Sequence, residues 1–161
     1  GWLLIASSPL SPAAMLPIFV YGTLKPGEIN HTVCAHYVQA VAPAIAYGSL
    51  YHLPFGYPAM SLDASHWVVG CLLHFSDPQL LTILDQFEQH DPSVFQRLFP
   101  TTDLATHQYQ RTRIQTYTPQ QHPLTLAWSY TMTTAQIQQL NGTKTAHNHW
   151  RGADYALPPS H

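Results

Sequence analysis

The stretch Ile18-Phe19-Val20-Tyr21-Gly22-Thr23-Leu24-Lys25-Pro26-Gly27 decides how the rest of the chain is interpreted. Its first three residues favour β-structure and predict a buried strand, and the glycine and proline that follow predict a tight loop. Consecutive backbone N–H groups at the end of a strand can hold an anion or a developing oxyanion. A strand and turn without a functional role is the simpler interpretation. A functional interpretation therefore requires a chemical partner for this loop elsewhere in the chain.

The composition predicts one domain and a small ligand. The 161 residues are 45% hydrophobic, only 9% are charged, and the formal net charge is -2. A chain of this size can bury a core as one domain. Its weak charge offers no electrostatic surface for nucleic acid or an anionic membrane, so neither is expected as a partner. We expect a single domain over residues 15–161 and interpret residues 1–14 as an extension or linker that need not be ordered. Whether the protein is a monomer or a dimer stays open.

The cysteine content predicts a reduced, cytoplasmic protein. Cys34 and Cys71 are too few for a disulfide framework and have no C-x-x-C spacing. The short apolar run 2–5 has neither the basic region of a signal peptide nor the length of a membrane-spanning helix.

Alternating and periodic patterns predict the elements that follow the loop. Residues 30–46 fit a short helix or a strand, and residues 54–60 read as a turn-rich loop. Strands are expected at 44–53, with a break at Gly48, and at 67–75, 109–117 and 124–132, the last two forming a hairpin. Thr133 is expected to cap a helix over 135–140, which breaks at Asn141-Gly142 and leads into an irregular C-terminal segment.

An amphipathic helix is predicted after the strand at 67–75. Ser76 or Asp77 can cap it, and its apolar residues recur at helical spacing as Leu80, Leu81, Leu84 and Phe87. Asp85 and Glu88 are three residues apart and lie on the same general side of this helix. A glutamate at a helix end is ordinarily a solvated surface residue. The irregular excursion over 89–107 has the length of a functional lid or a flexible insertion.

Six motifs occur in a characteristic order. They are F-V-Y-G-T-L-K-x-G (19–27), Y-P-A-M (57–60), V-x-G-C-L-L (68–73), L-D-Q-F-E (84–88), Y-Q-R-T-R-I (109–114) and A-W-S-Y (127–130). Together they resemble the γ-glutamylcyclotransferase-like family, also called AIG2-like, over residues 18–132. The resemblance implies an α+β fold, a small mixed β-barrel flanked by helices, with the Y-G-T-L loop and the L-D-x-x-E helix end over one cavity.

The resemblance also implies a reaction. The substrate would be a γ-glutamyl amine or peptide whose own α-amine attacks its γ-carbonyl, giving 5-oxoproline and a released amine, without metal or cofactor. Glu88 would be the general acid/base, and we expect a semi-enclosed apolar setting to raise its pKa from the usual value of about 4.3. Substrate would be bound by backbone groups of Tyr21, Gly22, Thr23 and Leu24, and by the side chains of Tyr109, Arg111 and Tyr130.

The chain departs from the family pattern in two places. Gln89 follows Glu88 where family members often have glycine, and a long insertion separates Glu88 from Tyr109. A non-catalytic member that binds a small metabolite or regulates a partner is therefore the alternative function.

Two further kinds of site were weighed from residue types alone. His147 and His149 could share a metal, but no third ligand is evident. A thiol pair of Cys34 with His31 or His36 is weaker than a packing role for the cysteine.

Overall fold

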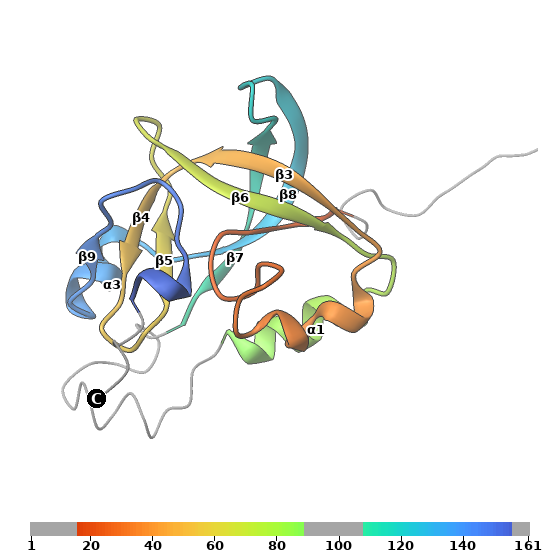
Figure 1. Ribbon diagram of the computed structural model, residues 1–161, viewed down its shortest axis with the longest axis horizontal. Helices are drawn as coiled ribbons and strands as arrows, with labels where there is room; N and C mark the ends of the chain where they lie inside the picture. Colours follow the sequence, from red (N-terminus) through yellow and green to blue (C-terminus); the bar gives the residue numbers. More distant parts are fainter. Residues whose placement is uncertain (1–15, 89–107, 156–161) are drawn as a thin grey trace, which may run out of the picture.

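The computed structural model describes residues 16–88 and 108–155, and its centre is a closed barrel of five strands. The strands follow the order β2-β6-β3-β7-β8, with bounds Ile18–Val20 (β2), Ala40–Tyr47 (β3), Trp67–His74 (β6), Gln110–Tyr117 (β7) and Pro123–Thr131 (β8). Neighbouring strands are antiparallel except β2 and β8, which are parallel where Ile18 pairs with Trp128. The expected α+β fold with a small mixed barrel flanked by helices is confirmed (Figure 1).

A second sheet of three strands lies beside the barrel. Its order is β5-β4-β9, with bounds Pro58–Ser61 (β5), Ser49–His52 (β4) and Thr143–Lys144 (β9). The predicted break at Gly48 is confirmed, since β3 ends and β4 begins on either side of it. The prediction of a loop over 54–60 was wrong in its second half, because Pro58 to Met60 pair with β4. Pairing with a neighbouring strand outweighed the weak β propensity of these residues.

The helix α1 spans Gln79–Phe87 and packs on the outer face of the barrel (Figure 1). It begins after Asp77, whose carboxylate accepts a hydrogen bond from the backbone N–H of Gln79 at 2.9 Å. Leu80 and Leu84 are fully buried in one cluster with residues of β2 and β6. Burying these leucines fixes the rotation of the helix and therefore the direction of its C-terminal end.

The segment before β3 contains both of the elements that the sequence allowed. Two 3-10 helices, η2 (His31–Val33) and η3 (Ala35–Tyr37), precede the strand that begins at Ala40. The helix α3 (Thr134–Gln139) has the predicted cap, because the Thr133 hydroxyl accepts from the Gln136 backbone N–H and the Gln136 side chain accepts from the Thr133 N–H.

Small residues on the strands keep the barrel narrow. Its interior cluster includes Phe19, Ala44, Ala46, Leu72 and Ala127, all nearly inaccessible to solvent. The larger side chains of β8 lie on the outer face, where α1 covers one end of the strand. The other end leaves Leu124 and Leu126 43% and 41% exposed.

The C-terminal segment wraps the end of the barrel and contacts the loop after β2. Trp150 is 2% exposed, and its indole N–H donates to His52 Nδ1 at 3.0 Å. The Lys25 ammonium donates to the carbonyl of Trp150, and the backbone N–H of Gly152, which opens the 3-10 helix η5 (Gly152–Asp154), donates to the Glu28 carboxylate at 3.0 Å. These two bonds fix the loop after β2 to the C-terminal segment.

Two expectations, an extension at 1–14 and an excursion at 89–107, lie outside the described residues. In the parts that are described, no helix has the length and apolar character needed to cross a membrane.

Candidate active site

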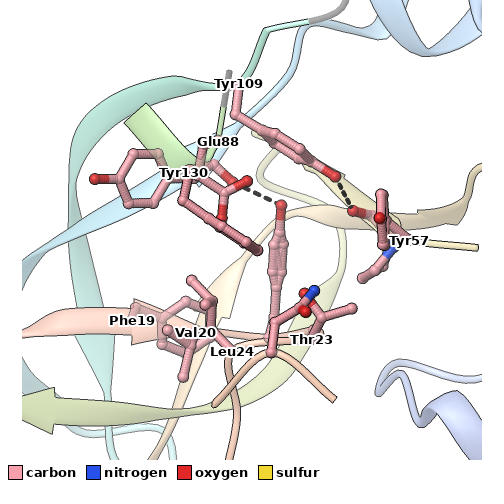
Figure 2. Close-up of a pocket in the computed structure, with 13 residues that line it drawn as sticks. Phe19, Val20, Thr23, Leu24, Tyr57, Glu88, Tyr109 and Tyr130 are labelled. Carbon is pink, nitrogen blue, oxygen red and sulfur yellow. Dashed lines mark hydrogen bonds between the residues drawn. The ribbon is translucent and has the colours of Figure 1, made fainter. Parts of the chain in front are cut away.

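The loop after β2 and the C-terminal end of α1 meet at one cavity of about 220 Å³ (Figure 2). The loop supplies backbone, and the helix end supplies a carboxyl group. Aromatic and apolar walls come from the start of β5, from β8 and from the residues just before β5 and β7. The described residues that line it are Phe19, Val20, Tyr21, Gly22, Thr23, Leu24, Asn30, Tyr57, Pro58, Phe87, Glu88, Tyr109 and Tyr130. Segments as far apart in the chain as 19–30 and 130 therefore share one small space.

Glu88 is the single carboxylic acid among the described lining residues. It follows the last turn of α1, where its backbone N–H donates to the Leu84 carbonyl at 2.9 Å. Burial raises the pKa of Glu88 from 4.5 to about 8. Within residues 16–88 and 108–155 no hydrogen bond or ion pair reaches its carboxylate, so nothing there offsets the lost hydration of the charged form. The group exchanges a proton near neutral pH.

The backbone of the loop at the cavity has its carbonyl groups engaged within the chain and its N–H groups without a partner in the described residues. The three carbonyl oxygens of residues 22–24 accept hydrogen bonds from further along the chain: Gly22 from the Lys25 N–H (3.1 Å), Thr23 from the Asn30 N–H (2.9 Å) and Leu24 from the His31 ring Nδ1 (2.8 Å). The N–H groups of these same buried residues have no partner in the described part of the chain. A buried, unpaired N–H is costly, so this wall is suited to an anion or a polarised carbonyl oxygen.

Gly22 is required by the close approach of β5. A Cβ atom at this position would lie 2.3 Å from Cγ of Pro58, far inside van der Waals contact. Pro58 thus closes the cavity directly against the loop backbone, and only glycine leaves the space for it.

The Tyr21 hydroxyl joins three strands rather than facing a ligand. It donates to the Tyr130 carbonyl at 2.6 Å and accepts from the Met60 backbone N–H at 3.1 Å. Burial raises the pKa of Tyr21, and the nearby Glu88 adds to this, so the phenol stays neutral. Its ring is part of the cavity wall, and its hydroxyl holds the strand end in place.

Tyr109 and Tyr130 place their rings in the cavity wall and direct their hydroxyls to protein groups (Figure 2). The Tyr109 hydroxyl donates to the Pro58 carbonyl at 2.5 Å, and the Tyr130 hydroxyl donates to Asp85 at 2.7 Å. Burial raises the pKa of both tyrosines. Each ring is therefore held in the wall by a hydrogen bond from its hydroxyl to another protein group.

Arg111 was predicted to bind substrate, but it is not among the described residues that line the cavity. Its guanidinium donates to the Asp85 carboxylate at 2.9 Å and lies 4.6 Å from the centre of the Trp128 ring. From the sequence, Arg111 and Arg113 lie on alternate residues of one strand and either could be a structural ion-pair partner. The motif match alone favoured Arg111 for the cavity. Its partner Asp85 lies on α1, and a contact between two elements is not visible in the pattern of one strand.

The remaining lining residues were not selected from the sequence. Tyr57 and Pro58 belong to the Y-P-A-M motif, which signalled this segment without assigning its residues to the site. Phe87 precedes Glu88 and was assigned to the apolar face of α1. Asn30 had no sequence signal beyond its place after the glycine turn.

Neither alternative site gains support from its geometry. The Cys34 Sγ is 3.7 Å from His31 Nδ1, but burial raises the pKa of this thiol to about 11, which opposes thiolate formation. The rings of His147 and His149 have centres 6.5 Å apart. In the described ranges, no group of three or more His, Cys, Asp or Glu side chains is placed to hold a metal ion.

Similar folds occur in solved structures, all at low sequence identity. An AIG2-like protein from Mus musculus is 24% identical, with a TM-score of 0.60 over 85% of this chain and 88% of that one. YkqA from Bacillus subtilis is 22% identical, with a TM-score of 0.56, and the match covers 84% of this chain but 39% of YkqA. The protein At5g39720.1 from Arabidopsis thaliana is 13% identical, with a TM-score of 0.54 over 88% of this chain and 80% of that one.

A search of curated proteins found no significant match. The family model described as "Gamma-glutamyl cyclotransferase, AIG2-like" matches residues 18–152, which include the barrel, the loop after β2 and the helix end that carries Glu88. The chain therefore belongs to the γ-glutamylcyclotransferase, AIG2-like family.

Proposed function

We propose that this protein cyclises a γ-glutamyl amine or peptide to 5-oxoproline and releases the amine. The observation that carries the proposal is the pairing, in one cavity, of a carboxyl group of raised pKa with a row of buried backbone N–H groups that lack partners in the described chain. Cyclisation needs both, because an amine must lose a proton and a carbonyl oxygen must accept negative charge.

Glu88 is the proton carrier in this proposal. The α-ammonium of the substrate gives its proton to the Glu88 carboxylate, and the free amine attacks the γ-carbonyl carbon. With its pKa raised to about 8, Glu88 is a stronger base than an ordinary glutamate. It therefore accepts the proton of an α-ammonium at a lower cost in free energy. Glu88 then returns the proton to the departing nitrogen as the C–N bond of the tetrahedral intermediate breaks. The attacking nitrogen loses its second proton to the released amine or to solvent, which leaves the lactam N–H of 5-oxoproline.

Backbone N–H groups of residues 22–24 stabilise the oxyanion of that intermediate or hold the glutamyl carboxylate. The loss of one such donor typically costs about 10²–10³ in rate. The loop packs against Pro58 and is hydrogen-bonded to Trp150 and Gly152. This support favours preorganised backbone N–H donors. We place the reaction in the cytoplasm, in line with two cysteines that are both free.

The test is a 5-oxoproline release assay with γ-glutamyl dipeptides, γ-glutamyl-lysine and glutathione. We expect release from at least one substrate, and a loss of about 10²–10⁴-fold in Glu88→Gln, because general acid/base catalysis is worth that much. Asp154→Asn is the matched control, since this carboxylate pairs with Arg151 on the surface and lies outside the cavity. No release from the folded protein with any of these substrates would refute the proposal.

A further inference from the structure

Asn30 lies in the cavity wall, and its side chain makes no hydrogen bond with the described part of the chain. Its backbone N–H donates to the Thr23 carbonyl at 2.9 Å, which fixes the residue against the loop. It is also the N-cap residue of η2, a position where an asparagine side chain usually accepts a hydrogen bond from the helix. Here no side-chain cap bond is made, so the carboxamide is left at the cavity.

The Thr23 hydroxyl is in the same situation. The residue is 8% exposed and lines the cavity, and over residues 16–88 and 108–155 its hydroxyl has no hydrogen-bond partner. A buried hydroxyl without a partner is unfavourable unless a ligand supplies one.

The other polar side chains of this loop are committed to the protein. Lys25 donates to the Trp150 carbonyl, Glu28 accepts from Gly152, and the His31 ring bonds to the Leu24 carbonyl. Two neutral hydrogen-bond donors, an amide and a hydroxyl, thus remain on adjacent parts of one wall.

We propose that Asn30 and Thr23 bind the α-carboxylate of the glutamyl group and make the enzyme specific for substrates that carry it. The inference rests on the proposed function. The α-carboxylate stays charged throughout the reaction, so it needs hydrogen-bond donors when it leaves water. With this group held by side chains, the backbone N–H groups of residues 22–24 are free to bind the oxygen of the γ-carbonyl.

The decisive experiment compares two substrates that differ only in this carboxylate. γ-Glutamyl anilide cyclises to 5-oxoproline and aniline, and 4-aminobutyryl anilide, which lacks the carboxylate, cyclises to 2-pyrrolidinone and aniline. We expect Asn30→Ala and Thr23→Val to lower kcat/KM for the first substrate by about 10- to 100-fold, the usual effect of losing a hydrogen bond to a charged group. The second substrate should change by less than about threefold.

Asn30→Asp separates recognition from folding. It keeps the size of the side chain and the backbone bond to Thr23 but places a carboxylate against the substrate carboxylate. The loss with γ-glutamyl anilide should exceed that of Asn30→Ala, and 4-aminobutyryl anilide should show no such loss. Gln138→Ala, on the exposed face of α3, is the control that should change neither substrate.

A binding measurement keeps the result independent of turnover. In an NMR titration the wild-type protein should bind 5-oxoproline more tightly than 2-pyrrolidinone, and Asn30→Ala should remove most of that difference. Binding of this kind without any turnover would refute the proposed function alone. Equal loss of both substrates in Asn30→Ala, or an unchanged preference for 5-oxoproline, would overturn the inference about Asn30.

Discussion

Glu88 combines a proposed role in proton transfer with a cost to folding. Its pKa rises from 4.5 to about 8 on folding because burial removes the hydration of its charged form. The folded state therefore binds this proton more tightly than the unfolded state. The stability contributed by Glu88 is fully present below about pH 4.5 and is lost as the pH rises through about 8.

The prediction is that Glu88→Gln is more stable than the wild type at pH 8.5 and that this advantage shrinks toward pH 5. Glutamine has nearly the same shape but no charge to desolvate. Thermal unfolding of both proteins at several pH values measures the difference. Over the same pH range, kcat/KM of the wild type should increase with pH and level off above about pH 8, since the base must be unprotonated in the free enzyme. A stability difference independent of pH would contradict the raised pKa.

Gly22 and Gly27 form a matched pair for testing the loop. Gly22→Ala places a methyl group 2.3 Å from Pro58, so the loop must move. We expect a destabilisation of about 1–3 kcal/mol from overpacking and a loss of about 100-fold in kcat/KM from the displaced donors.

Gly27→Ala is the control for that experiment. Gly27 has φ of +87° with nothing within 4 Å of its added Cβ. The substitution should cost about 1 kcal/mol through backbone strain and leave kcat/KM near the wild-type value. Equal kinetic loss in both variants would show that flexibility, rather than the Gly22–Pro58 contact, governs the loop.

At the scale of the elements, one polar network joins α1 to the hairpin of β7 and β8. Asp85 on α1 accepts hydrogen bonds from Arg111 on β7 at 2.9 Å and from Tyr130 on β8 at 2.7 Å. Tyr130 is also a cavity wall, so the network braces the helix end against the barrel near Glu88.

Arg111→Gln should affect folding more than substrate binding. The ion pair with Asp85 is about one-third exposed and is worth little by itself, and the contact with the Trp128 ring adds to it. We expect a loss of about 0.5–2 kcal/mol in the free energy of unfolding and an unchanged KM. A large rise in KM without loss of stability would instead indicate that Arg111 binds substrate.

At the scale of the whole molecule, the C-terminal segment completes both the core and the support of the active-site loop. Trp150 is 2% exposed, belongs to the barrel cluster and lends its carbonyl to Lys25. Trp150→Ala should therefore destabilise the fold by about 3–5 kcal/mol, measured by urea unfolding.

Tyr155→Ala provides the comparison. Its ring stacks on His52 with centres 3.7 Å apart but is 40% exposed. We expect a cost of only about 1 kcal/mol. Equal effects of the two substitutions would mean that Trp150 is not part of the core.

Local patterns along the chain were enough to predict most strands, both α-helices, the cap at Thr133 and the order of motifs that marks the family. They also singled out the loop at Gly22 and the helix end at Glu88. They failed at β5 and β9, because Pro58 to Ser61 and Thr143–Lys144 become strands only by pairing with β4. A two-residue strand has no periodicity of its own to detect.

The sequence by itself determined most strands and helices, since hydrophobic periodicity is a property of short stretches. The resemblance of its ordered motifs to a known family implied the barrel and the residues nearest the proposed chemistry. Only the tertiary structure decided the rest. It paired Arg111 with Asp85, left the side chain of Asn30 without a cap hydrogen bond at the cavity, and engaged the loop carbonyls while the loop N–H groups have no partner in the described residues. Each of these outcomes depends on which groups meet after folding, and the hydrogen-bond competition among them is settled by three-dimensional contacts that no local pattern encodes.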